Sequence, residues 1–176
     1  MSLLLLLGIL GFILVIVLKK PLIISFEENN RWVNKLKRAK WFQNHWLSGL
    51  FLFSMNAALF AAVCLFFILL SFFVIPYLHI LVGFAAVILS FILWIAITKA
   101  WKGTRWNRFK MGITGSSFYI LLIAGFAYWM RELKPSYPGE DIFMGAIFLI
   151  FGMIAALIAF IACLVITGFS HKQSEL

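Results

Sequence analysis

Two short segments of the chain combine cationic and aromatic side chains at close spacing. Residues 31–46 read RWVNKLKRAKWFQNHW and residues 99–110 read KAWKGTRWNRFK. Lysine and arginine bind phosphate and carboxylate groups, whereas tryptophan prefers the headgroup level of a bilayer. We therefore expect a contact with anionic lipid or with a partner through the following residues: Trp32, Lys35, Lys37, Arg38, Lys40, Trp41, Trp46, Lys102, Arg105, Trp106, Arg108 and Lys110.

Helical spacing in residues 31–46 predicts one amphipathic helix that lies in the membrane interface. Trp32, Leu36, Ala39 and Trp46 fall near one face of such a helix, although Trp41 breaks the pattern. Its cations would lie near anionic headgroups, where each contributes about 1 kcal/mol. The simpler interpretation is that both basic segments only determine topology and anchor the chain. Because membrane topology already accounts for the cations, nucleic-acid binding is disfavoured.

Other reactive side chains do not form a recognisable constellation. His45, His79 and His171 are scattered along the chain, and metal ligation requires a cluster. The sequence contains no phosphate-binding loop, dinucleotide fingerprint, nucleophile elbow or HExxH motif. We therefore expect no cofactor and no metal, and a non-catalytic role is favoured over an enzymatic one.

Small and polar residues inside the apolar stretches predict close contacts between helices. Asn56 is the deepest strongly polar side chain, and we interpret it as a hydrogen-bonding contact between helices, with a substrate contact as the alternative. Alanine and glycine at spacings of three and four let helix backbones approach closely. Such ridges pack within one chain or, as the alternative, against another subunit. The candidate packing residues are Asn56, Ala58, Ala62, Gly152, Ala155 and Ala159.

The elements that must position these residues are membrane-spanning helices. The chain has 176 residues, of which 64% are hydrophobic and 12% are charged. A soluble domain of this size needs a polar shell, so this composition excludes soluble classes. A spanning helix needs about 20 apolar residues. Five stretches meet or approach this length without an internal charge: 1–18, 47–75, 77–98, 111–130 and 142–169.

These stretches divide the chain into four parts in an all-α membrane bundle. Residues 1–18 form an N-terminal anchor, because Lys19 and Lys20 follow the apolar run and no basic residue precedes it. Residues 19–46 form the basic interfacial segment. Residues 47–169 form a four-helix bundle of two hairpins, 47–98 and 111–169, and the first hairpin turns near Pro76. Residues 170–176 form a tail.

The placement of the charges predicts the orientation of the five spans. Residues 19–46 carry seven of the 15 basic residues and residues 99–110 carry five. Five spans place these 12 cations on one side, which the positive-inside rule makes cytoplasmic. Six of the seven tryptophans lie near the same boundary. The N-terminus is therefore expected outside and the C-terminus inside, in a cell membrane that we take to be the bacterial plasma membrane.

Three functions are compatible with this architecture. The favoured one is a non-catalytic accessory or assembly subunit that packs against other membrane subunits and anionic lipid, because the spans carry no charge and the loops are short. The second is a small transporter or lipid-handling protein that uses Asn56, the serines Ser116 and Ser117 and the two basic loops. The third is an enzyme that acts on lipid headgroups at the cytoplasmic face.

Overall fold

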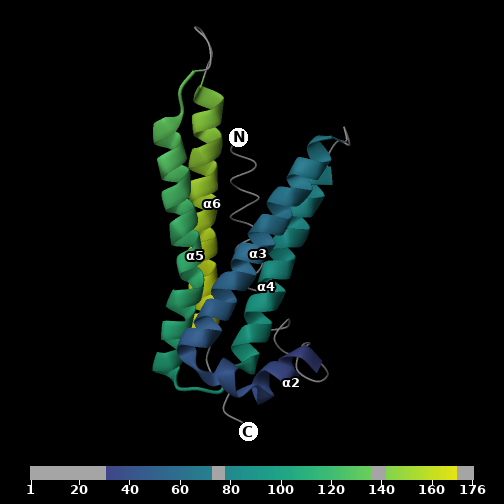
Figure 1. Ribbon diagram of the computed structural model, residues 1–176, viewed down its shortest axis with the longest axis vertical. Coiled ribbons are helices and arrows are strands. Elements are labelled where there is room, and N and C mark those ends of the chain that lie inside the picture. The colour runs from purple at the N-terminus through teal and green to yellow at the C-terminus, as the bar shows by residue number, and fades with distance from the viewer. Residues whose placement is uncertain (1–30, 73–77, 136–141, 170–176) are drawn as a thin grey trace.

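A computed structural model describes residues 31–72, 78–135 and 142–169, and these residues are almost entirely helical (Figure 1). The short helix α2 (Arg31–Arg38) and the 3-10 helix η1 (Lys40–Gln43) precede four long helices. These are α3 (His45–Ser71), α4 (Leu78–Ala100), α5 (Arg105–Glu132) and α6 (Phe143–Gly168). The described part of the chain contains no strand. The all-α prediction is therefore confirmed.

The four long helices are long and apolar enough to cross a bilayer. They contain 27, 23, 28 and 26 residues, and a rise of 1.5 Å per residue makes each longer than the hydrocarbon core of about 30 Å. They correspond to the last four predicted spans and indicate an integral membrane protein. The predicted span at 1–18, residues 19–30 and the tail at 170–176 lie outside the described residues.

The long helices form two hairpins that meet at one end and separate toward the other (Figure 1). One hairpin is α3–α4 and the other is α5–α6. They meet beside α2 and η1, where α3 packs on α5 and α4 packs on α6. We call this end the convergent half, which comprises residues 31–60, 90–119 and 156–169. The remaining described residues form the splayed half.

Residues 31–46 do not form the single amphipathic helix that the sequence predicts. Helix α2 ends at Arg38, because Ala39 (φ −74°, ψ 111°) is extended and turns the chain into η1. Asn44 (φ −86°, ψ 122°) makes a second break, and its side chain caps α3 by accepting a hydrogen bond from the Trp46 amide at 3.0 Å. These breaks place Phe42 in the core with no exposed surface. Burial of an aromatic ring accounts for the departure from a continuous helix.

Glycine permits the close approach of α3, α5 and α6 in the convergent half. A Cβ atom on Gly115 would lie 2.3 Å from Leu52 Cδ2, and one on Gly49 would lie 2.8 Å from Thr114 Cβ. A Cβ atom on Gly112 would lie 3.1 Å from the Gly168 backbone. Any larger residue at these positions would push the helices apart. The three glycines therefore fix where the hairpins meet.

Candidate functional site

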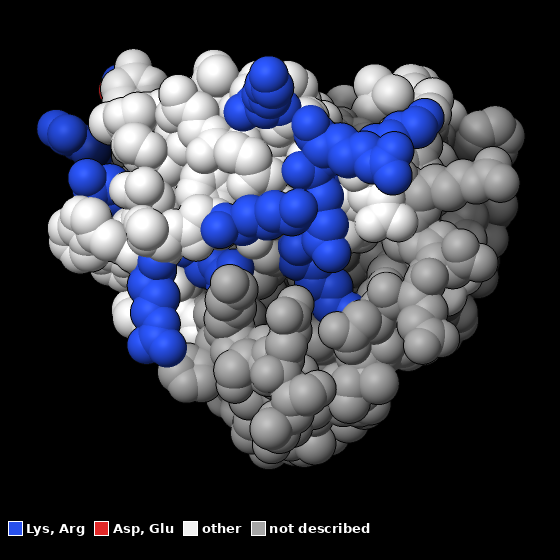
Figure 2. All heavy atoms as spheres, turned by 90° about the horizontal axis from the view of Figure 1, so that it is seen from below, with Lys and Arg blue, Asp and Glu red and all other residues white. Residues whose placement is uncertain are grey.

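Cationic and aromatic side chains cover the end of the molecule formed by α2, η1 and the start of α5. Figure 2 shows Lys and Arg side chains gathered on this face. Trp41, Trp46 and Trp106 are exposed there, while Lys37 is half-buried. Trp32 belongs to α2, but its side chain lies outside the described set. The exposed cations among the predicted contact residues are Lys35, Arg38, Lys40, Lys102, Arg105 and Lys110. We call this surface the basic face.

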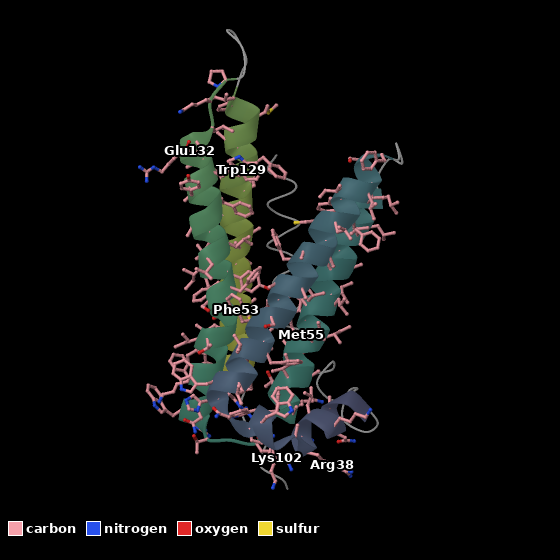
Figure 3. All side chains as sticks on the ribbon, in the orientation of Figure 1. Arg38, Phe53, Met55, Lys102, Trp129 and Glu132 are labelled. Carbon is pink, nitrogen blue, oxygen red and sulfur yellow. The ribbon has the colours of Figure 1, made fainter. Side chains whose placement is uncertain are left out.

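The basic face has no carboxylate near it among the described residues. Glu132 is the single acidic residue in residues 31–72, 78–135 and 142–169, and it ends α5. Figure 3 places Glu132 and Trp129 at the splayed end, far from Lys102 and Arg38. Among the described residues, no acid therefore offsets the positive charge of this face.

Gln43 joins the two basic segments, which are distant in sequence. Its Oε1 accepts a hydrogen bond from the Lys102 amide at 3.0 Å. Its Nε2 donates to the Ala100 carbonyl at 3.2 Å and to the Lys37 carbonyl at 3.4 Å. Gln43 was not expected to have this role from the sequence. A lone glutamine between Phe42 and Asn44 gives no signal of such a bridge.

Trp101 packs against the turn that connects α4 to α5. Its indole is 3% exposed and meets Phe42 edge-to-face, with ring centroids 6.5 Å apart. A Cβ atom on Gly103 would lie 2.5 Å from the indole ring, so this position requires glycine. The α4–α5 turn therefore lies flat on a buried aromatic pair.

Arg108 differs from the other predicted contact residues because its side chain points into the fold. It is 9% exposed, and Nη2 donates to the Trp101 carbonyl at 3.3 Å. Arg108 is one turn before Met111 and Gly112, which are also buried, so it belongs to the inward face of α5. In the sequence Arg108 was expected to contact lipid or a partner. In the structure it stabilises the α4–α5 turn.

Trp106 and Lys110 lie on the outward face of α5. Trp106 is 64% exposed, and the Lys110 ammonium lies 5.6 Å from the centre of its ring. The Trp106 ring stacks on Phe109 with centroids 5.8 Å apart. Phe109 in turn meets Phe169, the residue that follows α6, at 5.3 Å. The pair is therefore held by an aromatic row that connects α5 to α6.

Asn56 joins all four long helices from the middle of the convergent half. Its side chain is 2% exposed. Nδ2 donates to the Gly115 carbonyl of α5 at 3.2 Å and to Cys163 Sγ of α6 at 3.8 Å. Oδ1 accepts from Trp94 Nε1 of α4 at 2.8 Å. These bonds engage both ends of the amide, which leaves little of it for a substrate.

A second polar contact joins α4 to α6 in the same half. Thr98 Oγ1 is within 3.2 Å of the Ile166 carbonyl and within 2.8 Å of the Trp94 carbonyl in its own helix. Neither Thr98 nor Trp94 was expected from the sequence to form hydrogen bonds between helices. Trp94 resembled an interfacial anchor in the sequence, since its ring could not be assigned a direction from spacing alone.

The predicted alanine ridges face outward more than inward. Ala58 and Ala62 of α3 and Ala155 of α6 are exposed, and Ala159 is half-buried. Gly152 does meet a neighbour, because a Cβ atom there would lie 3.0 Å from the Phe126 ring. The exposed alanines are not packed within the described chain. The alternative, a contact with another subunit, remains a prediction.

Among the described residues, no group of three or more His, Cys, Asp or Glu could hold a metal ion. No family model, no curated protein and no solved structure matched the chain.

Proposed function

We propose that this chain is a non-catalytic subunit of a larger membrane assembly, and that it packs against partner membrane subunits and anionic lipid. The observation that carries the proposal is the outward ridge of α3. Ala58 and Ala62 lie one turn apart, and both are exposed on a helix whose opposite side holds Asn56. Ridges of small residues let a neighbouring helix approach closely in lipid.

The internal use of Asn56 favours this proposal over transport. A transporter binds its substrate through polar groups near the middle of the bilayer. Asn56 is the deepest side chain that the sequence offered for such a role, and its amide bonds Trp94, Gly115 and Cys163 instead. The buried polar side chains of the convergent half thus hold helices together.

The proposed orientation places the basic face at the cytoplasmic surface. The proposed topology has five spans, with the N-terminus outside and the C-terminus inside a bacterial plasma membrane. The support is the positive-inside rule together with the gathering of described cations at one end (Figure 2). The face would then meet the anionic headgroups of the inner leaflet.

Purification from native membranes in mild detergent tests the proposal. The wild-type chain should co-purify with an unrelated subunit in fixed stoichiometry. The double variant Ala58→Leu/Ala62→Leu should lose that subunit while it keeps its thermal stability, because both side chains are exposed. Ala124→Leu is the matched control, an exposed alanine on α5.

Three results would overturn the proposal. The first is purification of the wild-type chain alone or as a homo-oligomer. The second is retention of the partner by the Ala58→Leu/Ala62→Leu variant to the same extent as by the wild type. The third is release of the partner by Ala124→Leu as complete as that by the double variant, which would show that the α3 ridge is not the contact.

A further inference from the structure

The geometry points to a phospholipid-binding site at the start of α5, where Trp106 and Lys110 hold the phosphate of an anionic lipid and the helix above them contacts its acyl chains. This inference deepens the proposed contact with anionic lipid and rests on it. It assigns that contact to one place on the basic face. It does not depend on the partner subunit.

Side chains along the outward face of α5 follow the order of groups in a phospholipid. Trp106 and Lys110 are four residues apart and exposed, and the ammonium lies over the ring at 5.6 Å. Ile113, Ile120 and Leu121 continue the same face at helical spacing, and all three are exposed. A cation and an indole at one level, followed by an apolar stripe, fit a headgroup phosphate and the chains below it.

The first turn of α5 adds positive charge without a compensating acid. Arg105 occupies this turn and is exposed, and no acidic residue is present in it. The N-terminal end of a helix carries about half a positive charge, so a cation there repels the helix dipole. A bound phosphate would offset both the dipole and the cation. The unfavourable placement of Arg105 therefore favours an anionic ligand beside the first turns of α5.

The aromatic row distinguishes a lipid from a soluble anion or an acidic protein. Phe169 is exposed and meets Phe109 at 5.3 Å, and Phe109 stacks on Trp106. This apolar surface lies directly beside the cations and would be left in water by a soluble anion. An acyl chain can cover it and at the same time bring the phosphate to Lys110. The mixed surface thus selects a molecule with both parts.

The test uses the full chain, purified in an uncharged detergent, with phosphatidylglycerol as the probe. Binding is counted by native mass spectrometry, and thermal unfolding is followed in parallel. Phosphatidylglycerol should bind more tightly than phosphatidylcholine. In Lys110→Gln the affinity for phosphatidylglycerol should fall about fivefold, equivalent to about 1 kcal/mol for one basic residue. Trp106→Leu should also weaken binding.

Arg131→Gln is the matched control, because Arg131 is an exposed cation at the opposite end of the same helix. Its affinity for phosphatidylglycerol should equal that of the wild type. Equal loss in Arg131→Gln and Lys110→Gln would overturn the site, as would equal binding of the two lipids.

Two further arms separate the possible sources of the anion. Inorganic phosphate at the concentration used for phosphatidylglycerol should not raise the unfolding temperature. A rise equal to that caused by phosphatidylglycerol would show that the site binds soluble anions instead. If polyglutamate raised the unfolding temperature and phosphatidylglycerol did not, the surface would bind an acidic protein and not a lipid. Failure of the subunit proposal would appear in the co-purification experiment and would leave these measurements unchanged.

Discussion

The convergent and splayed halves use the same kinds of residue with different results. Glycines in the convergent half meet neighbours, as Gly115 does at Leu52. Gly83 and Gly125 in the splayed half have no atom within 4 Å of an added Cβ atom. Polar groups differ in the same way, because Asn56 bonds across helices whereas Ser71 Oγ donates to Ile68 of its own helix at 2.6 Å. Small and polar residues therefore join the two hairpins only where these already meet, whereas Gly152 of the splayed half packs on Phe126 within the α5–α6 hairpin.

The largest expected difference between the halves is at glycine. In Gly115→Ala the new methyl group would lie 2.3 Å from Leu52 Cδ2 and 2.7 Å from Leu52 Cβ. Overpacking of this kind costs about 1–3 kcal/mol, and we expect the upper part of that range because Leu52 is fully buried. Gly125→Ala should leave stability unchanged or raise it by about 0.5–1 kcal/mol through helix propensity. Thermal unfolding in mild detergent measures both.

A double-mutant cycle identifies the cause of the Gly115 effect. The cost of Gly115→Ala should shrink when it is combined with Leu52→Ala, since the two nearest atoms, Leu52 Cδ2 and Cγ, are then absent and only Cβ remains in close contact. Additive costs would indicate that the helices part for another reason. Equal effects at Gly115 and Gly125 would remove the distinction between the two halves.

A smaller loss is expected when Asn56 is replaced. Asn56→Leu removes the hydrogen bonds to Gly115 and Trp94 and leaves the buried indole N–H without its acceptor. Interhelical hydrogen bonds in membranes average about 0.6 kcal/mol, so the two together should contribute about 1–2 kcal/mol. The midpoint of unfolding in denaturant reports this loss.

Ser54→Leu provides the control for Asn56→Leu. Ser54 lies on the same helix two residues away, and it is exposed. Its replacement should change the midpoint by less than about 0.5 kcal/mol. If both variants lost equal stability, Asn56 would be no more than another residue of an apolar helix.

The smallest effect should follow from Gln43→Leu. This variant loses the two hydrogen bonds that join η1 to Ala100 and Lys102 at the α4–α5 turn, and a third to Lys37 of α2. These bonds lie at the end of the bundle, so the turn should loosen locally while global stability falls by about 1 kcal/mol or less. Trypsin should cleave after Lys102 and Arg105 faster than in the wild type.

Asn34→Leu is the control for the trypsin experiment. Asn34 lies in α2 and is exposed. Its cleavage pattern should match that of the wild type. Unchanged cleavage in Gln43→Leu would mean that Trp101 and Arg108 alone hold the turn.

Much of the fold followed from hydrophobicity and charge. Four helices were predicted from apolar stretches free of charge, because a spanning segment must satisfy its own backbone and exclude charged side chains. The helices extend beyond the predicted apolar stretches where the adjoining polar residues also favour helix. Helix α5 begins at Arg105, six residues before the predicted start, since Thr104 caps the helix by accepting from the Asn107 amide at 3.4 Å.

Contacts between helices were harder to predict. Apolar residues surround each long helix, so spacing alone does not show which side faces protein and which faces lipid. Ala58 and Gly115 are both small residues in spans, yet Ala58 is exposed and Gly115 meets Leu52. The cluster MGITGSS at 111–117 held a signal, because small residues at 112, 115 and 116 share one face.

The sequence also could not show which residues of the two basic segments are buried and which are exposed. Residues 31–46 have a helical period, but an extended Ala39 sends Phe42 inward and leaves Trp41 exposed. Arg108 and Lys110 are two residues apart, and only the former is buried. Residues two positions apart on a helix point about 200° apart, and which of them faces the protein depends on how α5 packs on its neighbours.

The contact between Asn56 and Cys163 gives the protein a natural reporter of its own opening kinetics. Both cysteines are free thiols, with Cys163 fully buried against the Asn56 amide and Cys64 partly exposed on α3 in the splayed half. An alkylating reagent reaches a buried thiol only during local or global opening. The ratio of the two alkylation rates in the unmodified chain therefore measures how often the hairpins part.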